Sequence, residues 1–251
     1  MNNKAKTALQ YLILLLAIPA VILLGVTVFK DRQYAFIALA VAFLACVPFF
    51  MSFEKSESSG KLLIIIAVMI AMSSVGRFIF AAVPHFKPVT AIVVITAIYF
   101  GPRAGFVTGA LTAVISNFYF GQGPWTPFQM FSWGVIGLIA GLIAPLIRER
   151  KPIPMILLAV YGVFSGIIYS LLMDTWTTLW WDGTFNLTRY IAYVVTALPV
   201  TATYAVSNVI FLLVFTFPIG SVLERMQYKY GIGEVKKGAK SERHSKERQE
   251  L

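Results

Sequence analysis

The chain has 251 residues, of which 58% are hydrophobic and 13% charged, and its mean hydropathy is +0.77. This composition is typical of a polytopic membrane protein and excludes a soluble globular domain. A net charge of +10 would suggest a nucleic-acid partner in a soluble protein, but here much of it lies from Arg225 onward, where membrane topology explains it better. One cysteine and two histidines offer neither a disulfide framework nor a metal site, and we expect no cofactor.

Eight apolar runs predict an all-α protein with about eight transmembrane helices. In chain order they are 10–29, 34–53, 62–83, 89–101, 105–120, 126–147, 155–173 and 190–223. The fourth run would make a helix of roughly 20 Å, which is too short to cross a hydrocarbon core of about 30 Å unaided. We therefore expect a short helix buried among its neighbours. Pro199 and Pro218 predict kinks in the long last run.

The positive charges predict how these spans are oriented. With the N-terminus inside, sixteen Lys and Arg residues fall on the cytoplasmic side and four fall outside. Both termini are therefore expected to be cytoplasmic. Lys4 and Lys6 precede the first run as in a signal peptide, but that run is long and lacks a cleavage site, so we expect a retained helix. Residues 231–251 are rich in charge and predict a disordered basic cytoplasmic tail.

The sequence also shows no motif by which the protein could drive transport by itself. All acidic residues lie in predicted loops, in the tail or at helix ends, whereas ion-coupled transporters usually carry a carboxylate at membrane depth. There is no GxxxxGK[ST] phosphate loop, and no GxSxG or HExxH motif supports an enzyme. These observations favour a binding subunit that obtains energy from partners. The alternative is a self-contained channel or facilitator whose pore is lined by the same polar residues.

A polar set interrupts the apolar region between residues 77 and 146. Trp125, Gln129 and Trp133 are four residues apart and share one face of a predicted helix. Polar groups at membrane depth are costly unless they face a bundle interior, a cavity or each other, so this face predicts a small-molecule pocket. The other candidate substrate-binding residues are Arg77, His85, Lys87, Asn117, Gln122, Trp176 and Asn208.

Several candidates also have a purely structural explanation. Snorkelling to the lipid headgroups explains Arg77 as well as ligand contact does. A bond to a neighbouring helix is favoured for Asn208. Trp125 suits an aromatic belt at the membrane edge, whereas Trp133, two turns deeper, does not. Gln129 is the strongest single candidate, because a buried amide needs a partner.

From about Leu62 to about Arg225 the sequence resembles the substrate-specific S component of energy-coupling factor (ECF) vitamin transporters. The most specific segments are GFVTGALTAVISN (105–117) and GQGPWTPFQMFSWGVIGLIAGL (121–142). The resemblance implies a six-helix binding core, residues 62–230, preceded by two extra transmembrane helices in residues 1–61. It implies a non-enzymatic subunit of the bacterial plasma membrane that captures a vitamin from outside. Its implied partners are a transmembrane coupling subunit and two ATPases.

Further implications of the resemblance concern particular residues. Ala67 and Ala71 match an AxxxA step that docks on the coupling subunit; the alternative is that they pack inside the subunit or against the two extra helices. The loop with His85 and Lys87 would fold over the ligand, and an outer loop with Trp176 would close the pocket. The overall sequence looks most like the cobalamin-type branch. The basic candidates would equally suit a carboxylate such as that of pantothenate or biotin.

Overall fold

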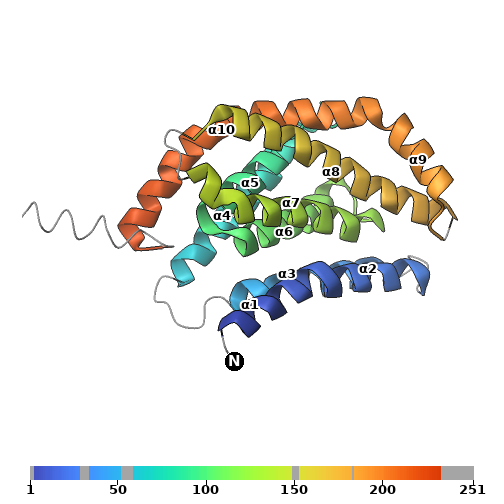
Figure 1. Ribbon diagram of the computed structural model, residues 1–251, viewed down its shortest axis with the longest axis horizontal. Helices are drawn as coiled ribbons and strands as arrows, with labels where there is room; N and C mark the ends of the chain where they lie inside the picture. Colours follow the sequence, from blue (N-terminus) through green and yellow to red (C-terminus); the bar gives the residue numbers. More distant parts are fainter. Residues whose placement is uncertain (1–2, 29–33, 52–58, 149–152, 183, 233–251) are drawn as a thin grey trace, which may run out of the picture.

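The computed structural model describes residues 3–28, 34–51, 59–148, 153–182 and 184–232, and these residues form an all-helical bundle without strands (Figure 1). Most of the expected tail, 231–251, and the ends of the first two predicted spans lie outside the described residues. Five helices are long and apolar enough to cross a membrane: Lys4–Thr27, Gly60–Ile79, Trp125–Arg148, Met155–Trp181 and Leu198–Tyr230. The protein is therefore a multi-pass membrane protein.

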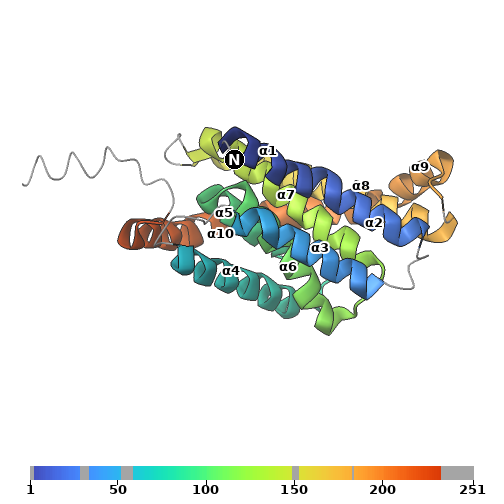
Figure 2. The ribbon, with the colours of Figure 1, turned by 90° about the horizontal axis from the view of Figure 1, so that it is seen from below.

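The N-terminal region forms a helical hairpin. Its first arm is one rod made of α1 (Asn3–Leu12), a π-helical turn η1 (Ile13–Ala17) and α2 (Ile18–Thr27), and its second arm is α3 (Tyr34–Phe50). Buried residues recur every four positions along the rod and pack against small buried residues of α3. Seen from below, the hairpin lies over α6 and α7 and leaves α4 to one side (Figure 2).

The remaining helices form the rest of the bundle. They are α4 (Ser59–Ile79), α5 (Val89–Phe100), α6 (Pro102–Phe120), α7 (Trp125–Arg148), α8 (Met155–Asp182), α9 (Leu187–Thr196) and α10 (Leu198–Tyr230). Every residue of α5 except the last is buried, and the helix packs against α4, α6, α7 and α10. The expectation of a short helix buried among its neighbours is confirmed. The helix is buried because it is apolar on all sides.

Glycines bring α6 and α7 into backbone contact. A Cβ atom added at Gly105 would lie 2.7 Å from the carbonyl oxygen of Gly137, and one added at Gly109 would lie 2.5 Å from the carbonyl carbon of Trp133. Such close approach is possible only where both helices carry small residues. The small-residue steps on these two helices therefore serve packing inside the bundle, and they hold the ends of α6 and α7 in a fixed register.

The structure corrects the predicted course of the last two spans. Helix α8 continues past Met173 to Asp182, so Trp176 lies on a helix and not in a loop. The last predicted span is two helices that meet at Ala197. Pro199 stands in the first turn of α10, where a proline fits without distortion, so it marks a helix start and not a kink. Pro218 lies inside α10. Helix α9 has no buried residue and lies at one end of the molecule (Figure 1).

Candidate functional site

A chain of hydrogen bonds links α4 to α8 through the ends of α6 and α7. Arg77 Nη1 donates to Ser116 Oγ at 2.5 Å and to Asn117 Oδ1 at 2.7 Å. Asn117 Nδ2 donates to Gln129 Oε1 at 2.9 Å, and Gln129 Nε2 donates to the hydroxyl of Tyr169 at 2.8 Å. We call these five residues, together with Thr126, the polar network. It joins Gln129 of α7, which the sequence analysis singled out, to partners on three other helices, α4, α6 and α8.

The turn between α6 and α7 positions the centre of this network. Gly121 has a φ of 96°, a backbone conformation that glycine adopts readily, and it ends α6 directly after Phe120. Asn117, fully buried, donates to Thr126 Oγ1 at 2.9 Å across the turn. Thr126 donates to Gln122 Oε1 at 3.1 Å, and Gln122 donates back to a carbonyl of α6. Gln122 thus orders the turn and only indirectly supports the network.

Aromatic rings surround the cation of the network. The guanidinium carbon of Arg77 lies 4.4 Å from the ring centroid of Phe120 and 5.2 Å from that of Trp133. Trp133 stacks on Tyr169, and the rings of Tyr169 and Tyr204 form a T-shaped pair at a centroid distance of 4.9 Å. Within the described residues no carboxylate pairs with Arg77. Arg77 therefore turns into the bundle, where two ring faces, a serine hydroxyl and an amide oxygen stabilise its charge, and snorkelling to the headgroups does not explain it.

The loop after α4 rests on α10 beside the network. His85 adopts a left-handed backbone conformation, with a φ of 57°, and its Nδ1 lies 3.1 Å from the hydroxyl of Tyr204. Lys87 exchanges backbone hydrogen bonds with the hydroxyl of Ser207. Its ammonium donates to the carbonyl oxygens of Phe80 and Val83 and so fastens its own loop. Desolvation lowers the pKa of Lys87, and the positive charge of Arg77 adds to this shift.

The remaining candidates lie outside the network. Trp125 does not join Gln129; its ring meets Trp176 edge-on at 6.1 Å, where α7 and α8 pack together. Asn208 donates to Ser165 Oγ at 3.0 Å, which is the interhelical role that the sequence favoured for it.

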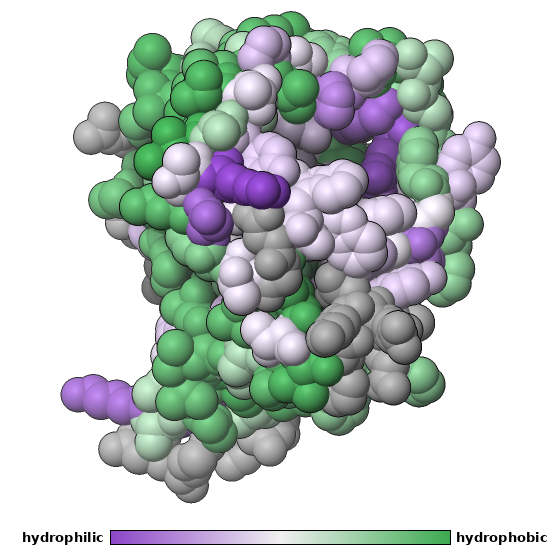
Figure 3. Space-filling model, turned by 90° about the vertical axis from the view of Figure 1, so that its right-hand side faces the viewer, coloured by the Kyte–Doolittle hydropathy of each residue, from purple (hydrophilic) through white to green (hydrophobic). Residues whose placement is uncertain are grey.

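At the end of the molecule that carries α9, hydrophilic side chains gather around a recess in the surface (Figure 3).

Sequence reasoning missed Tyr169, Tyr204, Ser116 and Thr126. The signal for Ser116 was present, because it directly precedes Asn117 in a predicted span. Tyr169 and Tyr204 both bring a hydroxyl into a predicted span, and such a group needs a partner when it is buried. Which partner it finds depends on how α8 and α10 pack, and this is visible only in the structure.

Ala67 and Ala71 lie on an exposed face of α4. Their neighbours on this face, Ile64 and Val68, are also exposed. Phe49 of the hairpin packs against an adjacent face of α4 and leaves the alanines uncovered. In the described residues, therefore, the two alanines pack neither inside the subunit nor against the N-terminal helices.

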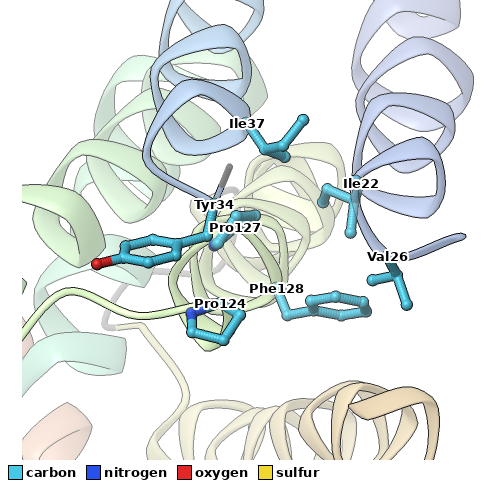
Figure 4. A pocket seen from close by; sticks show the side chains of 8 residues that line it. Ile22, Val26, Tyr34, Ile37, Pro124, Pro127 and Phe128 are labelled. Atoms are coloured by element: carbon cyan, nitrogen blue, oxygen red, sulfur yellow. The ribbon is translucent and has the colours of Figure 1, made fainter. Parts of the chain in front are cut away.

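A small apolar pocket lies between the hairpin and α7 (Figure 4). Ile22 and Val26 of α2, Tyr34 and Ile37 of α3, and Phe128 of α7 line it, together with Gly25, Pro124 and Pro127. Among the residues that the structure describes, no charged or amide side chain lines this pocket. Ligand pockets normally combine apolar walls with a few convergent polar groups, so the polar network is the better candidate site.

Comparison with known proteins adds an independent observation. Residues 57–225, more than half of the chain, match the protein family described as "ECF-type riboflavin transporter, S component". Similar curated proteins include UPF0397 proteins of Vibrio atlanticus (strain LGP32) and Aliivibrio salmonicida (strain LFI1238). They are 28% and 26% identical over 131 residues, which cover 47% of this chain and 71% of each relative. A UPF0397 protein of Vibrio vulnificus (strain YJ016) is 29% identical over 97 residues, 37% of this chain and 53% of the relative. No solved structure matches.

Proposed function

We propose that the polar network binds a flavin-type vitamin, with riboflavin as the first candidate. The reason is that the chain belongs to the family of S components of ECF-type riboflavin transporters. Proteins of this family are substrate-binding membrane subunits of ECF transporters and not enzymes. The cobalamin-type ligand expected from the sequence finds no support in the family description, which names riboflavin.

The observation that carries this proposal is the polar network itself. Its hydrogen-bond donors lie beside the rings of Phe120 and Trp133, and Tyr169 adds an aromatic ring of its own. A flat, partly polar ring system such as that of a flavin can stack on such faces while its heteroatoms accept hydrogen bonds. Stacking of a base on an aromatic side chain contributes about 1–3 kcal/mol in a related setting.

Substrate capture from outside follows from the placement of the charges. Lys61, Arg103, Arg148 and Lys229 lie at the ends of α4, α6, α7 and α10 that are opposite to the network. By the positive-inside rule we assign that end to the cytoplasm and the polar network to the outer half of the membrane. Both termini are then cytoplasmic, as the whole sequence predicts.

We further propose that the exposed face around Ala67 and Ala71 docks on the transmembrane coupling subunit of the transporter, which in turn binds two ATPases. Small side chains let another membrane helix approach the backbone of α4 closely. The N-terminal hairpin leaves this face open because it packs on α6 and α7. Energy for uptake would come from the ATPases, consistent with the absence of a phosphate loop from the chain.

Two measurements test the proposed function and its alternative. Purified protein in detergent should bind riboflavin with up to one-to-one stoichiometry in a fluorescence titration. Reconstituted alone into liposomes, it should bind labelled riboflavin without accumulating it or letting it equilibrate. Equilibration across the bilayer by the protein alone would instead establish a facilitator. Absence of riboflavin binding would refute the flavin assignment.

A further inference from the structure

Arg77 fixes the direction of the hydrogen bonds along the polar network. A guanidinium can only donate, so the atom of Asn117 that it contacts at 2.7 Å must be the amide oxygen. The amide nitrogen of Asn117 therefore faces Gln129 and donates to its oxygen. If the Gln129 amide were turned over, two NH₂ groups would face each other. The nitrogen of Gln129 must then donate to Tyr169.

The side branches of the network run in the same donor-to-acceptor direction. Ser116 accepts from Arg77 and donates to a carbonyl oxygen one turn earlier in α6, at 2.6 Å. Thr126 accepts from Asn117 and donates to Gln122 Oε1. The hydroxyl hydrogens of both branches are thus used within the protein, and the oxygen of each of the three amides already accepts one hydrogen bond there.

The unused groups at the two ends of the network are hydrogens. Tyr169 accepts from Gln129, so its own hydroxyl hydrogen has no acceptor within the described part of the chain. Among the described residues Arg77 donates through Nη1 alone, so the hydrogens of Nε and Nη2 have no acceptor there. Both end residues contact the ring of Trp133, Arg77 at 5.2 Å from its centroid and Tyr169 as a stacked ring at 5.4 Å. Free donors therefore lie close to the aromatic face that we assign to ligand stacking.

We propose that this site, taken as the flavin site argued above, selects its ligand through a surface that only donates. The site binds a ring whose edge carries carbonyl oxygens or unprotonated nitrogens. It binds the same ring more weakly when those nitrogens carry hydrogen. For a flavin, the oxidised ring presents N1, N5 and two carbonyl oxygens as acceptors. The dihydro form carries a hydrogen on N5, and this N–H would oppose a donor of the protein and leave it unpaired.

The charge of Arg77 does not by itself require an anionic ligand. Phe120 and Trp133 stabilise the guanidinium through their ring faces, and Ser116 and Asn117 offer oxygen atoms to it. A neutral ring with acceptor atoms is therefore sufficient. Hydrogen bonds from a cationic donor to such atoms are stronger than those from a neutral donor, and this favours the acceptor-rich edge further.

Calorimetric titration under anaerobic conditions tests this selectivity on the purified protein. We expect oxidised riboflavin to bind roughly tenfold or more tightly than dithionite-reduced riboflavin. In the variant Gln129→Glu the carboxylate would accept from both Asn117 and Tyr169 and would turn the tyrosine hydrogen away from the ligand. The preference for the oxidised form should then fall about tenfold or reverse.

The same substitution at the opposite end of the bundle provides the matched control. Gln227 is as buried as Gln129, at 6% against 7% exposure, but bonds to Arg148 and to the carbonyl oxygen of Tyr99. Gln227→Glu should keep the wild-type preference. Equal binding of both oxidation states by the wild-type protein, or the same change in both variants, would overturn the proposal while leaving flavin binding in place.

A second readout needs no ligand. The Raman doublet of tyrosine distinguishes a phenol that donates a hydrogen bond from one that accepts, and subtraction of the Tyr169→Phe spectrum isolates Tyr169. We expect an accepting phenol in the wild-type protein and a donating one in Gln129→Glu. If riboflavin fails to bind in either oxidation state, the flavin assignment fails. The doublet still shows whether the Tyr169 hydroxyl accepts a hydrogen bond from Gln129 or donates one. A donating Tyr169 in the wild-type protein would disprove the donor-only surface.

Discussion

The rings of Trp133 and Tyr169 lie 5.4 Å apart and 22° from parallel, so that α7 and α8 meet through a stacked pair at the end of the polar network. Only Trp133 of this pair was identified from the sequence. Its partner also receives the last hydrogen bond of the network. One residue, Tyr169, thus joins the aromatic and the polar parts of the site.

Replacing Trp133 with alanine should weaken riboflavin binding. The loss of an aromatic stacking face corresponds to about 1–3 kcal/mol, or roughly a ten- to hundredfold higher Kd. Fluorescence titration of the purified variant measures this. Trp181→Ala serves as the control, because that side chain is 68% exposed and its removal should leave the affinity unchanged. Unchanged affinity in Trp133→Ala as well would remove Trp133 from the binding site.

Replacing Asn117 with alanine should impair both binding and stability. The change leaves Arg77, Thr126 and Gln129 without a shared partner in a buried place, at a cost of about 1–3 kcal/mol for an unpaired polar group. We expect a lower melting temperature in detergent and at least about tenfold weaker riboflavin binding.

The matched control for Asn117 is Asn208→Ala. This substitution breaks a buried amide bond to Ser165, between α10 and α8, so it should lower the melting temperature with little effect on affinity. If both variants lost affinity to the same extent, the effect at Asn117 would reflect general destabilisation, and its specific role in the network would be wrong.

The spacing of α6 and α7 offers a third prediction. At Gly109 a Cβ would meet the backbone of Trp133, so Gly109→Val should push the helices apart and separate Asn117 from Gln129. Overpacking of this kind destabilises by about 1–3 kcal/mol. Thermal unfolding and riboflavin titration should both show a loss. Gly60→Ala, where no atom of the described residues lies within 4 Å of the added Cβ, should show neither.

Apolar run length and helix periodicity predicted the parts of the fold that depend on local sequence. The run that became α5 is apolar on every side but too short to span a membrane. Burial among neighbouring helices is the environment that suits such a helix. Gln129 and Trp133 were placed correctly on one side of α7 because they are one helical turn apart. Trp125, in the first turn, shares that spacing but meets Trp176, since α8 extends further than its apolar run.

The parts that were missed depend on contacts between distant segments. Residues 174–182 are polar and aromatic, which is the composition of a loop at the membrane edge, yet they continue α8. The break at Ala197 divides what the sequence indicated as a single predicted span. The role of Tyr169 depends on Gln129, 40 positions away, and nothing in the local sequence of either residue specifies the other. The hairpin could equally have covered the exposed face of α4, and only its packing on α6 and α7 shows that it does not.

The last prediction concerns docking on the coupling subunit. In the double variant Ala67→Trp with Ala71→Trp, two large side chains stand on an exposed face of α4 and would keep another helix from approaching closely. Riboflavin binding should remain nearly intact, because the polar network starts at Arg77, further along the helix and inside the bundle. Copurification with the coupling subunit and ATP-dependent uptake should be lost. The control is Leu39→Trp with Phe43→Trp, on α3 of the hairpin, where the native side chains are 67% and 69% exposed. If assembly survives in the alanine variant and fails in the hairpin variant, the hairpin and not α4 carries the docking face.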